Sequence, residues 1–127
     1  KHCPDGVDIY FDNVGGTISD IVIDGIADRG KVIVCGQISQ YNLPDQEFGP
    51  RNLWQFLRKQ ATIEGFNVGR YADHAEIARK RLTRLVQQGT LKYKEDVIDG
   101  LENAPAAFIG LMKGENFGKL LVRVSED

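Results

Sequence analysis

The apolar positions of this chain follow two periods in turn. Residues 7–14 (VDIYFDNV) are rich in β-branched and aromatic side chains and precede two glycines, which is typical of a strand that ends in a turn. From Thr17 the apolar residues recur at helical spacing, and Gly30 is placed to end this helix in a left-handed cap. A strand at 31–35 follows, and its apolar run 32–35 is typical of a strand buried on both faces. The pattern predicts a βαβ unit with parallel strands.

The same alternation continues to the end of the chain. Pro50 suits the first turn of a helix, and a short strand near 61–68 follows it. Asp73 is expected to cap the next helix, with Glu76 as its capping-box partner and Gly89 at its end. The remaining expected elements are a strand at 92–98, a helix at 102–112 and a strand at 119–124. Strands and helices alternate throughout, which predicts an α/β fold.

Polar residues follow the apolar run 32–35. Gly36 would let the backbone approach a ligand closely, while Ser39, Tyr41 and Asn42 supply hydrogen-bonding groups. Ligands of open α/β sheets bind just beyond the carboxyl ends of the strands. The segment is therefore a candidate binding site, and an ordinary exit from strand to loop is the alternative.

The composition indicates a soluble globular protein of at most one domain, with 127 residues, 42% hydrophobic and 27% charged, and a net charge of −2. This charge gives no reason to expect nucleic acid or an anionic membrane as a partner. No apolar segment is long enough to span a bilayer, and residues 1–6 lack the apolar core of a signal peptide. Cys3 and Cys35 make no disulfide framework, and the scattered histidines and cysteines form no metal-ligand cluster. We therefore expect a reduced, cytoplasmic protein without a metal.

No sequence motif identifies a complete active site. The chain has no GxGxxG after a first strand, no GxxxxGK[ST] phosphate loop and no GxSxG nucleophile elbow. One expected helix carries a basic face of four residues, Arg79, Lys80, Arg81 and Arg84. A basic stripe opposite an apolar stripe is usually a solvated face, and an anion site is the alternative.

Four stretches together resemble one family: FDNVGG at 11–16, CGQISQYN at 35–42, Gly65 and Phe66 with Val68, and GLENAPAAFIGLMKGENFGKLLVRV at 100–124. The family is the zinc-independent medium-chain dehydrogenases/reductases, in the branch of prostaglandin reductases and 2-alkenal (double-bond) reductases. The resemblance runs nearly end to end. It implies a C-terminal part of a longer protein, with residues 1–90 forming the second half of an NADP-binding Rossmann domain, a parallel sheet of three strands with helices. Residues 91–127 would form a strand-helix-strand segment that returns to pack on a catalytic domain.

The resemblance also implies a set of cofactor-binding residues. Asn13 would lie near the nicotinamide riboside, the segment 35–41 along the nicotinamide and ribose, and the segment 66–68 at the carboxamide edge. The complete set is Asn13, Cys35, Gly36, Gln37, Ile38, Ser39, Gln40, Tyr41, Phe66, Asn67, Val68 and Asn116. For Asn13 and Asn116 the alternative is a structural role in a turn, and Asn67 departs from the family, in which this position is commonly apolar.

The implied reaction is the transfer of hydride from NADPH to the β-carbon of an α,β-unsaturated aldehyde or ketone. Tyr41 is the candidate catalytic residue, because its hydroxyl stays protonated at neutral pH and can position the substrate carbonyl or the nicotinamide. No residue here must act as a base. The residues that would hold the 2′-phosphate lie upstream of the chain, and the loop after Asn42 does not reveal the substrate.

Two alternatives stay open. One is a quinone reductase of the same superfamily, and the other is a non-catalytic α/β module that dimerises. Relatives often dimerise through the strand that corresponds to 61–68, and an unpaired edge strand is normally covered. A homodimer through this edge is therefore expected.

Overall fold

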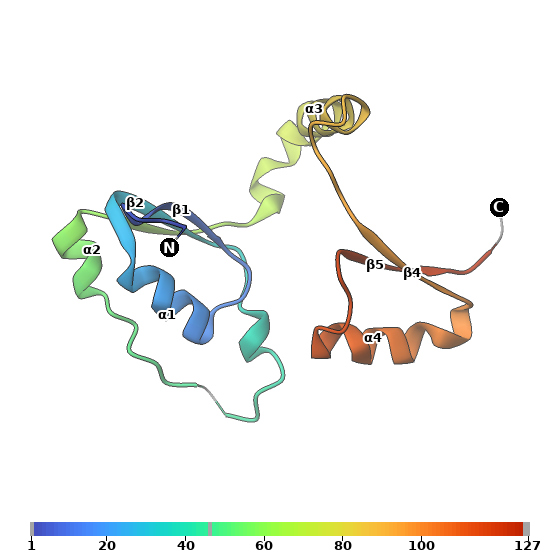
Figure 1. The fold of residues 1–127 in the computed structure, drawn as a ribbon, viewed down its shortest axis with the longest axis horizontal. Coiled ribbons are helices and arrows are strands. Elements are labelled where there is room, and N and C mark those ends of the chain that lie inside the picture. The colour runs from blue at the N-terminus through green and yellow to red at the C-terminus, as the bar shows by residue number, and fades with distance from the viewer. Residues whose placement is uncertain (1, 46, 126–127) are drawn as a thin grey trace. The chain divides into compact units, whose positions relative to one another are not determined.

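The computed structural model describes residues 2–45 and 47–125. Strands and helices alternate along the chain as the hydrophobic pattern predicts (Figure 1). The chain divides into two compact units, the first ending at Ala72 and the second beginning at Asp73. The functional division into 1–90 and 91–127 concerns the intact protein and stays a prediction.

The first unit is a parallel sheet of three strands in the order β1-β2-β3, formed by β1 (Val7–Asp12), β2 (Ile26–Val34) and β3 (Thr62–Gly65). The first connection is α1 (Gly16–Asp24), and the second contains the short 3₁₀ turn η1 (Ile38–Gln40) and α2 (Trp54–Lys59). The parallel pairing of β1 with β2 confirms the predicted βαβ unit.

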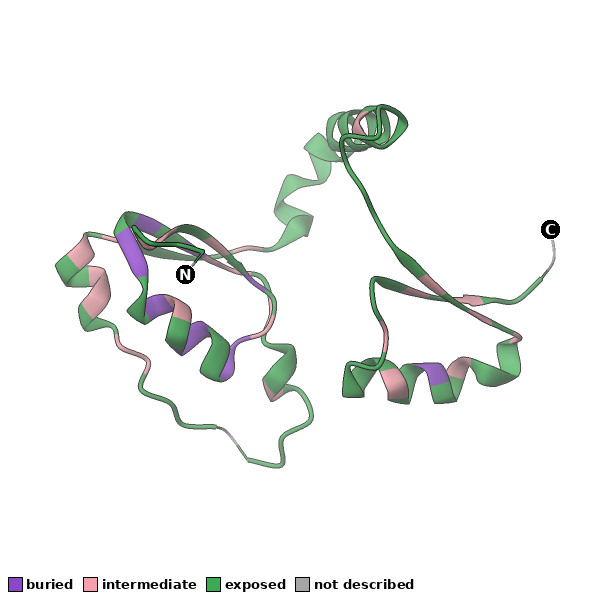
Figure 2. Ribbon diagram, viewed as in Figure 1, coloured by how far each residue is buried: buried purple, intermediate pink, exposed green. Residues whose placement is uncertain are grey.

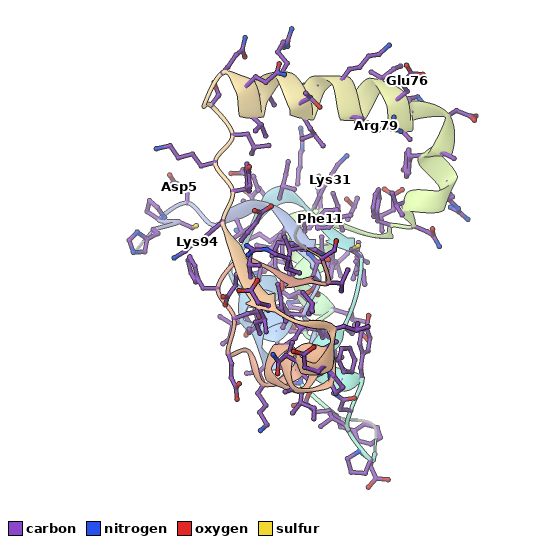
Figure 3. The ribbon with its side chains drawn as sticks, turned by 90° about the vertical axis from the view of Figure 1, so that its right-hand side faces the viewer. Asp5, Phe11, Lys31, Glu76, Arg79 and Lys94 are labelled. Carbon is purple, nitrogen blue, oxygen red and sulfur yellow. The ribbon has the colours of Figure 1, made fainter. Side chains whose placement is uncertain are left out.

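The core of this unit lies on one face of the sheet. Ile23 of α1, with Ile26 and Val32 of β2, forms a buried cluster against which Phe56 of α2 packs. Since both helices contact the same cluster, they cover the same face, and the buried positions of this unit in Figure 2 lie on β1, β2, α1 and the turn that joins β1 to α1. Neighbouring side chains alternate across a strand, so Phe11 and Lys31, labelled in Figure 3, lie on the other face and are exposed.

The second unit contains the helix α3 (Ala75–Gln87) and a strand-helix-strand segment. In that segment β4 (Glu95–Asp99) pairs in parallel with β5 (Lys119–Arg123), and the 3₁₀ turn η3 (Leu101–Asn103) and α4 (Ala104–Lys113) connect them. A further 3₁₀ stretch, η2 (Val68–His74), joins the two units. The predicted strands and helix of this segment are confirmed to within a few residues.

The predicted end of the first helix at Gly30 is wrong. The helix ends at Asp24, and β2 already begins at Ile26. Gly30 lies inside β2, where a Cβ atom would come within 2.7 Å of the Ile26 side chain. The register of β1 against β2 also shifts before Ile9, so this glycine permits a close approach at a bulge and does not cap a helix.

Three other local predictions are also wrong. Pro50 does not open α2, which begins at Trp54, because Arg51 adopts a left-handed φ of 42° and interrupts the helical path. His74, and not Asp73, is the N-cap of α3, because the helix begins at Ala75, one residue later than an Asp73 cap would place it. Cys35 lies after the last residue of β2 and is exposed, because the two helices cover only one face of this sheet.

The basic residues of α3 are exposed. Lys80 forms an ion pair with Glu76 one turn earlier, with 2.8 Å between Nζ and Oε1. Glu76 and Arg79 are labelled on this helix in Figure 3. Gly89 follows the helix with a φ of 67°, which confirms its predicted role at the helix end. Among the described residues no helix is long and apolar enough to cross a membrane.

Candidate functional site

The carboxyl ends of the three parallel strands meet at one edge of the first unit. β1 ends at Asp12, β2 at Val34 and β3 at Gly65. The predicted cofactor residues follow these ends directly, at 13, at 35–41 and at 66–68. The fold therefore brings together the whole predicted set except Asn116, at the position where ligands of open α/β sheets bind.

The side chain of Asp12 orders the turn from β1 to α1. Its Oδ1 accepts hydrogen bonds from the backbone N–H groups of Val14 and Gly15, both at 2.9 Å, and from the hydroxyl of Tyr10 at 2.9 Å. Its Oδ2 accepts a hydrogen bond from the Ser19 hydroxyl in the first turns of α1. Gly15 has a φ of 72°, and the same turn leaves Asn13 exposed at the edge of the sheet.

The turn after β1 holds the segment that follows β2. The backbone carbonyl of Asp12 accepts hydrogen bonds from the N–H groups of Cys35 at 2.8 Å and Gly36 at 3.0 Å. The carbonyl of Asn13 accepts from Ile38, and that of Val14 from the N–H and hydroxyl of Ser39. These three distances are 3.1, 3.0 and 2.6 Å. The candidate cofactor segment is thus fixed mainly through backbone groups.

Tyr41 folds back over the start of this segment. Its hydroxyl oxygen accepts the N–H of Gln37 at 3.2 Å, and a Cβ atom at Gly36 would lie 3.0 Å from the same oxygen. The side chain is 63% exposed, so a ligand can reach it. The hydroxyl proton has no acceptor among the described residues, which leaves Tyr41 able to donate a hydrogen bond.

The segment after β3 begins beside the end of β2. The N–H of Phe66 donates to the carbonyl of Val34 at 2.8 Å. Its half-buried ring contacts Phe11 edge-on and stacks on Tyr71, with centroid distances of 5.4 and 5.3 Å. The Asn67 Oδ1 accepts the N–H of Gly69 at 2.9 Å, so this amide stabilises its own turn. The ring contacts of Phe66 and the hydrogen bond of Asn67 are both consistent with a contact between the backbone of this segment and a cofactor.

The loop after Tyr41 borders an open, polar hollow of about 370 Å³. The loop is held to α1, because the Arg51 guanidinium contacts the buried Asp20 carboxylate at 2.5 Å and Asn52 donates to Asp24 at 2.8 Å. The hollow is lined by Gln37, Gln40, Leu43, Pro44, Asp45, Glu47 and Arg51. The fold thus supplies a space beside the strand ends that is bounded on one side by the loop.

Asp12 is an ionised acceptor, and both of its carboxylate oxygens accept hydrogen bonds from the protein. Burial by itself would raise its pKa, but the hydrogen bonds from Ser19, Gly15, Val14 and Tyr10 together hold the pKa below its usual value. Burial and the neighbouring Asp12 raise the pKa of Tyr10. Sequence reasoning did not single out Asp12 or Ser19, although an aspartate before a turn with two glycines is a known signal for side-chain to backbone hydrogen bonding.

Asn116 lies in the second unit. Its Nδ2 donates to the carbonyl of Gly118 at 2.9 Å, a contact of the kind expected for a turn residue. It also lines a hollow of about 280 Å³ between α4 and the β4–β5 pair, together with Asp96, Asn103 and Glu115 among others. Its predicted contact with a cofactor stays a prediction.

A family model described as zinc-binding dehydrogenase matches residues 1–122. The chain belongs to the zinc-binding dehydrogenase family. Curated relatives include a 2-alkenal reductase (NADP(+)-dependent) from Nicotiana tabacum, 43% identical over 130 residues, and an NADPH-dependent curcumin reductase from Escherichia coli, 38% identical over 132 residues. Each match covers 100% of this chain and 37% or 38% of the relative, so the chain spans little more than a third of their length.

The crystal structure of CurA from Vibrio vulnificus in complex with NADPH has the same fold. It matches with a TM-score of 0.88 and 37% identity, over 99% of this chain and 39% of that chain. These matches confirm the predicted membership of the medium-chain dehydrogenases/reductases and the predicted Rossmann-like α/β fold class.

The description of the matching family model names zinc, which allows the described side chains to be compared with a metal-ligand set. Across residues 2–45 and 47–125 no group of three or more histidine, cysteine, aspartate or glutamate side chains lies in a position to bind a metal ion. Both cysteines are free and exposed. The described residues therefore do not fit a zinc site.

Proposed function

We propose that this chain is the C-terminal part of an NADPH-dependent oxidoreductase. It would reduce the carbon–carbon double bond of α,β-unsaturated aldehydes or ketones, of the 2-alkenal or oxo-prostaglandin type. The observation that carries the proposal is the convergence of the segments after β1, β2 and β3 at one sheet edge. The relatives named for 2-alkenal and curcumin reduction support the same class of reaction.

The sheet edge fits a dinucleotide that lies across it. Asn13 is exposed there, and neither Gly36 nor Gly65 projects a side chain over the strand ends. A Cβ atom at Gly65 would meet nothing within 4 Å, so the space beside β3 is open. Asn13, the segment 35–41 and the segment 66–68 would hold NADPH. When bound, NADPH supplies the hydride that reaches the β-carbon of the substrate.

Tyr41 is the proposed catalytic residue. Negative charge develops on the substrate carbonyl oxygen during the reduction, and a donor aimed at this oxygen lowers the barrier. The Tyr41 hydroxyl accepts a hydrogen bond from Gln37, which fixes the oxygen and leaves its proton for the substrate or for the nicotinamide. Asp12 is buried and already accepts four hydrogen bonds, so it is not poised as a base, and the proposed mechanism requires none.

A homodimer through the edge strand is part of the proposal. β3 pairs only with β2 among the described strands, and all four of its residues are exposed. An edge with unpaired backbone groups favours pairing with a second copy, and we propose the segment 61–68 as that interface. Sedimentation of the intact protein tests this, and a monomer at micromolar concentration would contradict it.

The test of the function is NADPH consumption with a simple 2-alkenal, measured on the intact protein that carries this chain. We expect turnover, and we expect Tyr41→Phe to reduce it by about ten- to a hundredfold, since one donor to a developing oxyanion is typically worth about that much or more. Tyr93→Phe is the matched control, because Tyr93 is an exposed tyrosine of the second unit. It should leave turnover unchanged.

Three outcomes would contradict parts of this proposal. Equal turnover and equal NADPH affinity in Tyr41→Phe would remove the role of Tyr41. Turnover with quinones but not with alkenals would favour the quinone reductase alternative. A protein that neither binds NADPH nor turns over either substrate would favour the non-catalytic dimerising module.

A further inference from the structure

The buried carboxylate of Asp12 is the most connected polar group of the first unit. It is only 3% exposed, and it accepts hydrogen bonds from two backbone N–H groups and two hydroxyls. These donors come from β1, from the turn that follows it and from α1. A single side chain thus fixes the conformation of residues 12–16.

The conformation of that turn also determines the position of the segment after β2. The carbonyl groups of residues 12–14 accept the N–H groups of four residues, Cys35, Gly36, Ile38 and Ser39. If the turn lost its conformation, these carbonyls would no longer point at their donors. The positions of Asn13 and of the segment 35–39 therefore depend on the same carboxylate, although Asp12 itself is buried.

We propose that Asp12 is a positioning residue, which pre-orders the two adjoining strand-end segments so that NADPH binds without having to order them. The inference rests on the proposed function, because it concerns the site in which the cofactor would lie. Ser19 acts with Asp12, since its hydroxyl links the carboxylate to α1 and so fixes the entry of the helix. The lowered pKa of Asp12 supports the role, because the side chain stays an acceptor for all its donors across the neutral range.

The test measures NADPH affinity and steady-state kinetics on the intact protein with Asp12→Ala and Asp12→Asn. Without the carboxylate the cofactor must order the turn itself, and ordering even one residue weakens binding by about tenfold. We therefore expect Asp12→Ala to raise the Kd and KM for NADPH about tenfold while kcat at saturating NADPH changes by less than about twofold. Asp12→Asn should recover most of the affinity, because its Oδ1 can still accept the Val14 and Gly15 N–H groups while Ser19 turns to accept from Nδ2.

Asp20→Asn is the matched control. Asp20 is also a buried carboxylate of the first unit, 8% exposed, but its partner is Arg51 and not the turn after β1. This variant should lower the melting temperature and leave the Kd for NADPH within about twofold of the parent protein. A loss of affinity in Asp20→Asn as large as in Asp12→Ala would overturn the proposal, since general destabilisation would then explain both.

A second variant covers the case in which Asp12→Ala does not fold. Ser19→Ala removes one donor to the carboxylate and should weaken NADPH binding by about threefold. Unchanged NADPH affinity in the folded Ser19→Ala or Asp12→Ala protein, with a parent protein that binds NADPH, would overturn the positioning role alone. A parent protein that binds no NADPH would instead overturn the proposed function on which it rests.

Discussion

Gly36→Ala probes the contact between Tyr41 and the start of the candidate cofactor segment. The new Cβ atom would lie 3.0 Å from the Tyr41 hydroxyl oxygen and 3.4 Å from the carbonyl oxygen of Asn13. Ordinary contacts begin at 3.4 Å, so the carbonyl can stay in place while the hydroxyl must move by a few tenths of an ångström. Gly36 does not have a left-handed φ, so alanine adds no backbone strain.

The magnitudes follow from this displacement. The exposed Tyr41 ring can move, and the expected cost to folding is its hydrogen bond with Gln37, about 1 kcal/mol. A misplacement of about 1 Å can cost about a hundredfold in rate, so we expect Gly36→Ala to slow turnover by about three- to tenfold. Gly65→Ala adds a methyl group into open space at the end of β3 and serves as the control for folding.

The assay is a double-mutant cycle of Gly36→Ala and Tyr41→Phe in the intact protein, with turnover and NADPH affinity measured for all four proteins. In the phenylalanine background the hydroxyl is gone, so the alanine should change turnover by less than about twofold. The expected coupling is about 1 kcal/mol. An equal slowing by Gly36→Ala in both backgrounds would refute the reasoning, because the alanine would then act on the cofactor or backbone and not through Tyr41.

Three further predictions concern stability. Val32→Ala should lower the free energy of unfolding by about 2 kcal/mol in urea denaturation, because Val32 is 1% exposed at the centre of the core. Gly118→Ala should destabilise the β4–β5 pair by more than Gly114→Ala. Both glycines have a positive φ, but only a Cβ atom at 118 would meet the Lys94 carbonyl oxygen, at 2.3 Å. Hydrogen exchange of the Lys119 amide, which donates to that carbonyl, measures the difference. The pKa of Asp12 is lower in the folded protein than its usual 3.8. The contribution of the ionised Asp12 to the free energy of unfolding should therefore be fully present above about pH 4 and be lost as the pH falls through the folded-state pKa. Unfolding experiments across this pH range should show less of this loss in Asp12→Asn.

Most of the fold could be predicted because the hydrophobic period changes cleanly between strands and helices. The end of the first helix could not, since Ile26 continues the helical spacing of Ile21 and Val22. In the structure Ile26 instead pairs with Val7 in the sheet, and only this tertiary contact shows that the strand has already begun. In the sequence Gly30 is placed like the glycine that ends a helix. In the structure the Ile26 side chain and the β1 backbone leave no room for a Cβ atom at this position.

The candidate site could be assembled from sequence only in part. The segments after the three strands were recognisable by resemblance, and the parallel sheet then brings them to one edge. The role of Asp12 depends on hydrogen bonds to residues up to seven positions away, which a motif of consecutive residues does not reveal. The relation of Asn116 to this edge rests on resemblance alone, because that residue belongs to the second unit.

The backbone character of the contacts at the strand ends has a consequence for how such a site can be altered. The donors from Cys35, Gly36 and Ile38 are main-chain groups, so the frame of the site does not depend on the identity of the Gln37 or Ile38 side chain. These two exposed positions can therefore accept many different residues while the frame keeps its shape. Libraries of variants at Gln37 and Ile38 are therefore a starting point for a new substrate preference. The side chains at these two positions can be varied, while the main-chain hydrogen bonds that form the frame are kept.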